Sequence, residues 1–267
     1  MHPLTAAAIP IDLLRRDAIH GEIVGATGMA FLFNCEGPYL ITAWHNVTGY
    51  DYRGSKLLHS KGFIPEILRY GLWKRAGPGL AAREWREINL IGGDVTWYQH
   101  PSNPGEIDIS ALPIDFDESQ AWLSKPVNAL DMEKRLTPKP GQEAFVIGFP
   151  ENISGPSRTA IWKRASVASE AAIPHNGQEF FYVDTATRKG MSGSPVIIRH
   201  HGIFDPESKN GSLTLSGIIG TVENFCGIYV GRVGDDELGV QLGIVWKEQA
   251  IVEVIESKSP GKNPALD

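Results

Sequence analysis

A serine between two glycines is the first feature of this chain that could do chemistry. The stretch from 184 to 196 reads DTATRKGMSGSPV and places Ser192 between Gly190 and Gly193. Glycine permits backbone conformations that a Cβ would block, so successive N–H groups can converge on one point. Gly190 and Ser192 are therefore candidate donors for a carbonyl oxygen that becomes negative. A plain Gly/Ser turn explains the same residues, so a base and an acid must be found elsewhere.

His45 is the histidine best placed to act as that base. It follows the apolar segment 38–43, which we expect to be a strand, with only Trp44 between them. A rigid strand end holds an imidazole at hydrogen-bond distance from a nucleophile, as proton transfer requires. A histidine packed beside Trp44 with its ring N–H satisfied is the alternative. The other histidines lie in polar, terminal or loop stretches, where a solvated role is the default.

Asp108 is the unusual acid because an isoleucine flanks it on each side, in a segment expected to be a strand. A buried carboxylate is costly unless it is paired. A buried, hydrogen-bonded carboxylate is also what orients an imidazole and stabilises its cation. An edge-strand aspartate that points to water is the alternative. Asp94, Asp115 and Asp117 compete for the role, but each lies in a turn-like setting.

Short apolar segments separated by turn residues must position these three side chains. Residues 28–33 and 38–43 flank a Gly-containing turn and predict a β-hairpin. Later strand-like segments at hairpin-sized spacing predict an antiparallel barrel or sandwich. Their ranges are 143–148, 159–168, 179–183, 196–199, 213–222, 226–233 and 239–245. We expect helices at 9–19 and 247–258, and hairpins, long surface loops and some helix over 51–90.

Composition narrows the class of protein. The chain has 267 residues, of which 42% are hydrophobic and 21% charged, as in ordinary globular proteins. Its net charge of −6 offers no basic surface, so we expect no nucleic-acid partner. No apolar run reaches the roughly 18 to 20 residues that span a bilayer, so we expect no membrane partner.

The cysteines and the first ten residues bear on the compartment. Residues 1–10 lack the charged and apolar regions of a signal peptide. Cys35 and Cys226 are the two cysteines, either paired or both free, and two cysteines make no disulfide framework. We therefore expect a cytoplasmic protein.

Several signatures of other chemistries are missing. The sequence has no HExxH motif, no Cys/His cluster and no Gly-rich phosphate loop, so we expect no metal and no cofactor. The Gly-x-Ser-x-Gly signature and the strand–helix alternation of α/β-hydrolases are also missing, which disfavours an esterase or another acyl transferase.

Three segments resemble the motifs of trypsin-like peptidases. Residues 42–45, TAWH, resemble their Thr-Ala-x-His segment. Residues 107–112, IDISAL, resemble their Asp-Ile-Ala-Leu strand, and 190–195, GMSGSP, are similar to their Gly-x-Ser-Gly-Gly-Pro loop. The resemblance covers roughly residues 21 to 256, with the histidine and aspartate in the first half and the serine in the second.

Within that superfamily, the second half most resembles the bacterial V8-like glutamyl endopeptidases. The matching runs are 146–150, 160–162 and 184–196. The resemblance implies an all-β fold of two antiparallel six-stranded β-barrels with a C-terminal helix. The expected domains are an N-terminal extension at 1–20, a first barrel at 21–125, a connection at 126–140, a second barrel with the helix at 141–258, and a tail at 259–267.

The resemblance also implies a mechanism. Ser192 would attack the scissile carbonyl, His45 would take and return the proton, and Asp108 would fix the imidazole tautomer. The backbone N–H groups of Gly190 and Ser192 would hold the oxyanion. A serine endopeptidase that acts on proteins or peptides through an acyl-enzyme is therefore the leading hypothesis. Its rival is a catalytically silent protease-fold module that binds peptides or partner proteins.

Some positions depart from the family pattern. Met191 stands where activated trypsins carry an aspartate that pairs with a newly cut N-terminus, and Asn46 replaces the half-cystine of secreted relatives. Thr187 matches the threonine that touches a glutamate substrate in V8-like enzymes. Tyr229 stands where their pocket histidine is expected if the segment 227–231 is the match, whereas the alternative match, 217–220, offers no polar side chain.

These substitutions bear on the substrate. Tyr229 and Gly231, with Thr187, are the candidate substrate-binding residues. Ala186, at the expected base of the pocket, offers no acid for arginine or lysine, so we expect a P1 residue that is not basic. Glutamyl specificity is left open because the histidine is missing. No stretch reads as a PDZ or similar domain, so targeting is assigned either to a regulatory partner protein or to the 51–90 loops.

Overall fold

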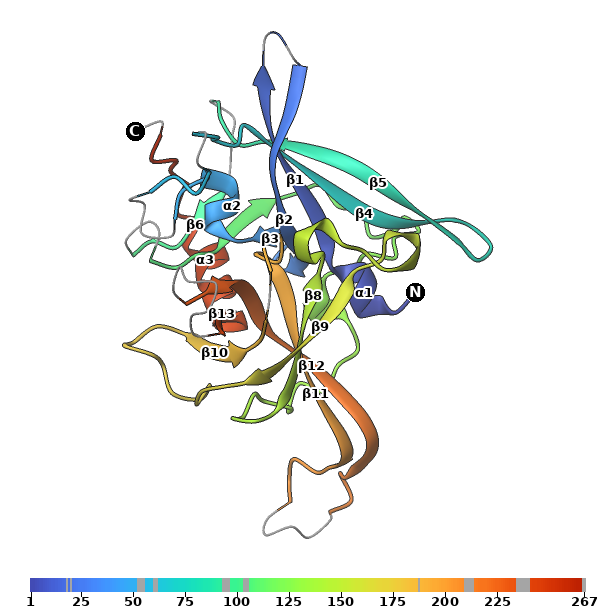
Figure 1. Cartoon of the computed structure of the whole chain (residues 1–267). Helices are drawn as coiled ribbons and strands as arrows, with labels where there is room; N and C mark the ends of the chain where they lie inside the picture. The colour runs from blue at the N-terminus through green and yellow to red at the C-terminus, as the bar shows by residue number, and fades with distance from the viewer. Residues whose placement is uncertain are drawn as a thin grey trace.

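The computed structural model of the chain describes residues 1–17, 19, 21–51, 56–59, 62–92, 97–102, 106–186, 188–208, 214–233 and 241–265. Antiparallel strands form two bodies, and Figure 1 shows the first, coloured blue to green, above the second, coloured yellow to red. The strands are β1 (Ile9–Asp17), β2 (Gly21–Asn34), β3 (Pro38–Thr42), β4 (Ile67–Gly77), β5 (Leu80–Asn89), β6 (Tyr98–Gln99), β7 (Ser110–Pro113), β8 (Glu143–Gly148), β9 (Ile161–Val167), β10 (Phe180–Asp184), β11 (Ser194–Phe204), β12 (Ile218–Arg232) and β13 (Leu242–Lys247).

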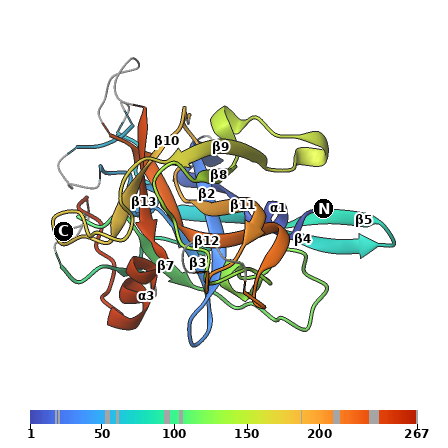
Figure 2. The same cartoon turned by 90° about the horizontal axis from the view of Figure 1, so that it is seen from below.

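The helices are short, with five to ten residues each. Figure 2 shows helix α3 and the β4–β5 hairpin on opposite sides of the molecule. The helices are α1 (Pro3–Ala7), α2 (Trp44–Thr48) and α3 (Glu248–Ser257), with 3₁₀ turns η1 (Val127–Ala129), η2 (Pro150–Asn152) and η3 (Pro156–Arg158). None of the helices in the described ranges is long and apolar enough to cross a membrane.

The first body is a seven-stranded sheet in the order β5-β4-β1-β2-β3-β7-β6. The β2–β3 hairpin predicted from residues 28–43 is confirmed, with Leu32 paired to Leu40. Strand β3 also pairs with β7, so the segment before His45 and the segment after Asp108 are neighbours in one sheet. This pairing brings together two residues that lie far apart in the sequence.

The second body is a closed barrel of six strands in the order β10-β13-β12-β11-β8-β9. Its longest strands, β11 and β12, pair from Ser194 with Tyr229 to Phe204 with Ile218. This hairpin extends beyond the barrel at the bottom of Figure 1. Ser192 lies two residues before β11, at the end of the hairpin that faces the first sheet.

Three apolar clusters hold the fold together. One fills the first sheet around Trp44 and Leu72, and another fills the second barrel around Phe181 and Val196. The third joins the two bodies, where Phe31 of β2 meets Phe225 of β12 edge-on with ring centroids 5.3 Å apart. Buried apolar area is the main favourable term in folding, so this shared cluster fixes the junction at which the candidate site lies.

The predicted all-β fold class of antiparallel barrels with a C-terminal helix is confirmed, with one difference in the first body. The second barrel has the predicted six strands. The first has seven, and among the described residues its edge strands β5 and β6 are not hydrogen-bonded to each other. Strand β1 was not among the predicted strands, and β6 is only two residues long and, of the described strands, pairs only with β7.

The helix expected over 9–19 is wrong, and the one over 247–258 is confirmed as α3. Ile9, Ile11 and Leu13 are buried at alternate positions, which is the period of a strand, and β1 pairs with both β2 and β4. Residues 9–17 are thus a strand of the first sheet rather than a helix outside it. In 51–90 the main element is the β4–β5 hairpin, without a helix in the described part.

Candidate active site

His45 lies in the first turn of helix α2, directly after strand β3. Trp44 anchors that turn, because its ring is fully buried and its Nε1–H donates to Gln99 Oε1 over 3.0 Å. The helix ends at Thr48 and is capped by Gly49, whose φ of 79° suits glycine. The packed histidine beside Trp44 is thus not the arrangement found: Trp44 points into the core, while the side chain of His45 is 16% exposed and borders a cleft.

Asp108 contacts His45 through both of its carboxylate oxygens. Oδ2 lies 2.7 Å from His45 Nδ1, and Oδ1 accepts the backbone N–H of His45 over 2.9 Å. The Asp108 side chain is only 5% exposed, so the alternative of a water-facing aspartate is wrong. A carboxylate only accepts hydrogen bonds, so this contact places the ring proton on Nδ1 and leaves Nε2 as an acceptor.

The backbone around Asp108 differs from the expected strand interior. Asp108 is at the centre of a three-residue turn, in which Ile109 N–H donates to Ile107 C=O over 2.8 Å, and β7 begins only at Ser110. Ile107 and Ile109 both pack in the cluster between the two bodies. The flanking isoleucines that drew attention to Asp108 therefore anchor a turn that directs the carboxylate to His45.

Ser192 lies in a loop that the first sheet holds in place. Its carbonyl accepts the N–H of Met29 over 2.8 Å and the side-chain Nδ2–H of Asn46 over 3.0 Å. Gly193, with φ of 92°, donates to Tyr229 C=O, and an added Cβ there would lie 1.8 Å from the Met29 carbonyl oxygen. The loop therefore requires glycine at 193, because no side chain fits between it and β2.

Asn46 is a site residue whose role the sequence did not reveal. It is 4% exposed, and its Nδ2 donates to both Ser192 C=O and Thr42 Oγ1, each over 3.0 Å. Thr42 in turn donates to Met29 C=O over 2.7 Å. Asn46 follows His45 in the same helix turn, so one short helix carries the histidine and anchors the serine loop.

The hydroxyl of Ser192 donates to Val230 C=O over 3.0 Å. Both Ser192 and His45 are described residues, and no hydrogen bond joins their side chains in this structure. Both line the same cleft, so the serine and the histidine face a common space. Hydrogen bonds between such groups are often incomplete in ligand-free proteins and form when substrate binds.

The backbone N–H groups of Gly190 and Ser192 have no partner among the described protein groups. Gly190 has φ of 86°, which a Cβ would strain, and a Cβ there would lie 3.0 Å from Phe149 C=O. The preceding carbonyl, that of Lys189, accepts the N–H of Glu151 over 2.7 Å. Two backbone donors without a described partner therefore lie beside the serine, and donors of this kind bind an anion where they converge on one point.

A cleft of about 590 Å³ runs past the serine and the histidine. On the His45 side its wall is apolar, with Val24 and Leu58 both more than half exposed and the Phe63 ring packed against Gly25 of β2. Glu151, Asn152 and Lys189 line it near the serine. Sites that bind small molecules and peptides are concave and largely apolar with a few convergent polar groups, as this cleft is.

The three candidate substrate-binding residues have different surroundings in the structure. Thr187 lies outside the described residues. The Tyr229 side chain is 2% exposed and packs in the core of the second barrel beside Val183, while its carbonyl holds Gly193. Gly231 has φ of 153°, and a Cβ added there would have no atom within 4 Å, so space is open at this position. Tyr229 thus supports the serine loop through its backbone rather than lining the cleft.

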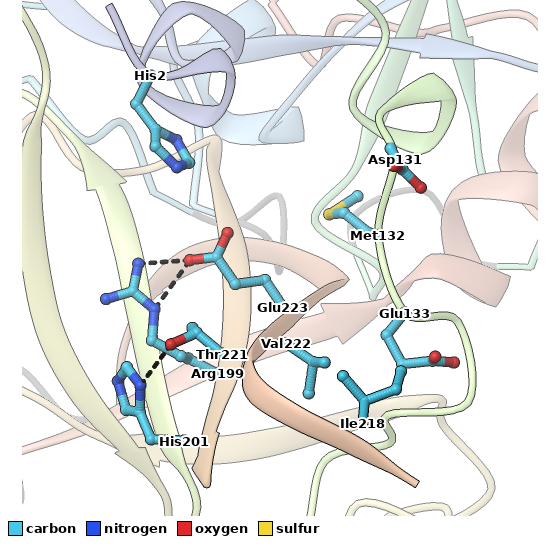
Figure 3. Close-up of a pocket in the computed structure, with 10 residues that line it drawn as sticks. All are labelled: His2, Asp131, Met132, Glu133, Arg199, His201, Ile218, Thr221, Val222 and Glu223. Atoms are coloured by element: carbon cyan, nitrogen blue, oxygen red, sulfur yellow. Dashed lines mark hydrogen bonds and ion pairs between the residues drawn. The ribbon is translucent and has the colours of Figure 1, made fainter. Parts of the chain in front are cut away.

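A second hollow of about 640 Å³ contains none of the predicted site residues (Figure 3). Its polar groups largely satisfy one another: Arg199 Nε donates to Glu223 over 2.8 Å, and the His201 ring contacts Thr221 Oγ1 over 2.8 Å. Although it is slightly larger, it offers no nucleophile. No group of three or more potential metal ligands occurs in the described part of the chain.

Two antiparallel β bodies with a histidine, an aspartate and a serine at their junction define the chymotrypsin-like class of fold. The family model of the trypsin-like peptidase domain matches residues 27–202, so the chain belongs to that family. A search of curated proteins finds no match.

Solved structures agree on the fold. The HtrA-type protease AlgW, solved with a tripeptide, superposes with a TM-score of 0.51 at 15% sequence identity. The alignment covers 95% of this chain and 60% of that one. The chain thus spans about three fifths of the length of this structural relative, and the likeness at such identity concerns the fold alone.

Proposed function

We propose that the protein is a serine endopeptidase that hydrolyses peptide bonds through an acyl-enzyme. The observation that carries the proposal is the double contact of Asp108 with His45, beside a serine loop in which the N–H groups of Gly190 and Ser192 have no partner among the described residues. A carboxylate that fixes the Nδ1–H tautomer prepares Nε2 to take a proton. Membership of the trypsin-like peptidase family supports the same reaction class.

In the proposed reaction, a peptide carbonyl enters the cleft and its oxygen meets the N–H groups of Gly190 and Ser192. The Ser192 hydroxyl leaves the Val230 carbonyl, donates to His45 Nε2 and attacks the carbonyl carbon. The oxygen becomes negative and is stabilised by the two backbone donors. The imidazolium, stabilised by Asp108, then protonates the leaving amine, and water repeats the sequence to release the acid.

The proposed substrate has a P1 residue that is not basic. Ala186 supplies no carboxylate to pair with lysine or arginine. The apolar wall formed by Val24, Leu58 and Phe63 lies on the side of His45, which protonates the leaving amine. We therefore assign this wall to apolar residues that follow the scissile bond. We propose a likeness to V8-like glutamyl endopeptidases for the serine loop alone. It does not extend to the substrate pocket, because the Tyr229 side chain is buried in the core.

We also propose that the enzyme works in the cytoplasm. Cys35 and Cys226 are free cysteines, which suits a reducing compartment. A regulatory partner protein remains part of the proposal, because the Ser192 hydroxyl bonds to Val230 rather than to His45. The same bond is what would favour the rival function, a silent module that binds peptides.

Profiling with a peptide library tests the proposal. The full chain and its Ser192→Ala variant are incubated with the library, and cleavage sites are read by mass spectrometry. We expect cleavage by the full chain alone, with P1 residues other than lysine and arginine and with apolar residues after the bond. Equal cleavage by both proteins would contradict the proposed nucleophile. Peptide binding without any cleavage would support the silent module instead.

A further inference from the structure

Arg83 joins the first sheet to a connection of the second barrel that borders the candidate oxyanion site. It extends from β5 toward residues 149–159, between β8 and β9, and Figure 1 shows this connection beside the β4–β5 hairpin. The Arg83 guanidinium carbon lies 4.3 Å from the ring centroid of Trp73 and 5.4 Å from that of Phe149. Its Nη2 donates to the carbonyl of Arg158 over 3.3 Å.

The aromatic rings, rather than an acid, hold this guanidinium. Its Nε is buried and has no hydrogen-bond partner in the described part of the chain. Burial, together with the nearby charge of Arg158, lowers the pKa of Arg83 to about 10. Its side chain lies flat across β4 because Gly71 has no Cβ, which would come within 2.4 Å of Arg83 Cδ. A cation over aromatic faces is stabilised by the ring quadrupoles.

The connection that Arg83 contacts has a strained backbone. Glu151, Asn152, Ser157 and Arg158 all have φ between 49° and 61°, and they are four of the seven non-glycine residues with positive φ in the described ranges. Such conformations are unfavourable for residues with a Cβ and persist only where surrounding contacts hold them. Arg83 supplies such contacts at both ends of the connection, on Phe149 and on Arg158.

The same connection sets the direction of the Lys189–Gly190 peptide. Glu151 N–H donates to Lys189 C=O over 2.7 Å. In a planar trans peptide the C=O and the following N–H point in opposite directions. Because the carbonyl of Lys189 is held against Glu151, the N–H of Gly190 points away from Glu151, and this N–H is one of the two donors that the proposed mechanism uses. Asn152 is tied to the cleft wall as well, since Thr27 Oγ1 donates to its Oδ1 over 2.7 Å.

We propose that Arg83 is a positioning residue that sets the oxyanion site, by clamping the 149–159 connection that holds the Lys189 carbonyl. The inference rests on the proposed peptidase function. Arg83 does not touch the substrate; it acts through Phe149 and Arg158 on the backbone of Glu151, and so on the N–H of Gly190. The β4–β5 hairpin is thereby coupled to the efficiency of the reaction in the cleft.

The test compares the full-length wild type with Arg83→Met, Arg83→Lys and the control Arg86→Met. Arg86 lies on the same strand, also faces an aromatic ring, that of Trp122 at 4.9 Å, and also donates to a carbonyl, that of Asp115. The readouts are kcat and KM for a cleaved peptide, and the affinity for the corresponding peptide aldehyde, whose oxygen occupies the oxyanion site in the adduct. Thermal unfolding of each variant reports the folded fraction.

We expect Arg83→Met to lower kcat by about 10- to 100-fold with little change in KM, since complete loss of one oxyanion donor costs roughly 10²- to 10³-fold. Aldehyde affinity falls in parallel, Arg83→Lys restores part of both, and Arg86→Met changes neither by more than about twofold. Equal effects of Arg83→Met and Arg86→Met, or a loss confined to KM or explained by the folded fraction, would overturn the inference.

Amide hydrogen exchange of Glu151 gives a readout that does not need hydrolysis. Release of the clamp should expose this amide and accelerate its exchange by about tenfold or more in Arg83→Met, but not in Arg86→Met. Unchanged exchange in Arg83→Met contradicts the clamp itself. A wild-type chain that cleaves no peptide contradicts the proposed function, while the exchange measurement still decides whether Arg83 holds the connection.

Discussion

Asp108 binds His45 twice, once at the backbone N–H over 2.9 Å and once at ring Nδ1 over 2.7 Å. The first contact fixes the position of helix α2 relative to β7, and the second fixes the rotation and tautomer of the imidazole. An asparagine in place of Asp108 presents an N–H₂ group on one side and so cannot accept at both positions. The two contacts together make the carboxylate, rather than any polar side chain of that size, the required group.

We expect Asp108→Asn to lower kcat by about 10⁴-fold, as loss of the orienting aspartate does in other serine peptidases. Peptide hydrolysis by the variant, measured together with thermal unfolding, checks this expectation. Asp115→Asn is the control, since Asp115 is an exposed acid a few residues further along the chain. Retention of more than about a tenth of wild-type kcat in folded Asp108→Asn would contradict the assigned role.

Gly193→Ala tests how tightly the serine loop packs on the first sheet. The new Cβ would lie 1.8 Å from Met29 O, at a φ of 92° that is itself unfavourable for alanine. We expect the free energy of unfolding to fall by at least about 3 kcal/mol. Urea denaturation measures the change. Gly202→Ala is the matched control, because Gly202 has φ of 107° with no atom within 4 Å. Similar losses in the two variants would mean that backbone strain, rather than the contact with Met29, decides the stability.

Asn46→Ala tests the link between helix α2 and the serine loop. The substitution leaves the Ser192 carbonyl with one of its two donors and removes a bond to Thr42. We expect a loss of about 1–3 kcal/mol in the free energy of unfolding, because two buried hydrogen bonds of about 0.5–1.5 kcal/mol each are removed. We also expect kcat to fall, since the position of Ser192 loosens.

Asn128→Ala is the comparison for Asn46→Ala, because Asn128 makes the same kind of side-chain to backbone bonds, to Asn34, at an exposed site. Denaturation and peptide hydrolysis are measured for both variants. A larger loss of activity in Asn128→Ala than in Asn46→Ala would contradict the anchoring role.

The two thiols should differ in reactivity. Burial raises the pKa of Cys226, whose Sγ–H donates to Val196 C=O, and Glu248 raises it further. Burial, Glu256 and Glu36 raise the pKa of the half-buried Cys35. The thiolate is the reactive form, so alkylation of Cys35 should be slow near pH 8 and accelerate as pH rises.

We expect Cys226 to stay unmodified until urea unfolds the protein. Mass spectrometry after iodoacetamide treatment checks both statements; rapid labelling of Cys226 in the folded protein would contradict its burial.

Local sequence patterns were sufficient to predict two kinds of element. Apolar segments bounded by turn residues predicted the β2–β3 hairpin, and apolar residues at helical spacing predicted helix α3. Strand β1 was misread because Leu13 and Leu14 are both buried, next to a bulge between them in the pairing with β2. Adjacent buried residues also fit one face of a helix, and only the partner strands decide between the two.

His45, Asp108 and Ser192 could be singled out in sequence because each combines a reactive group with an unusual local setting. Asn46 and Arg83 could not, since their roles depend on residues that lie far away along the chain: Ser192 for Asn46, and Phe149 and Arg158 for Arg83. Tyr229 was assigned to the substrate pocket from its position in a motif. The direction of its side chain depends on the pairing of β12 with its neighbours, which the sequence does not reveal.

Covalent labelling by a fluorophosphonate tests the central claim most directly, because such a probe reacts with a serine only when a base activates it and donors stabilise the adduct. The full chain, Ser192→Ala and His45→Ala are treated with the probe, and the site of the adduct is read by peptide mass spectrometry. We predict a single adduct on Ser192 in the full chain and none in either variant. A folded full chain that gains no adduct, or one that is labelled equally after Ser192→Ala, would contradict the account.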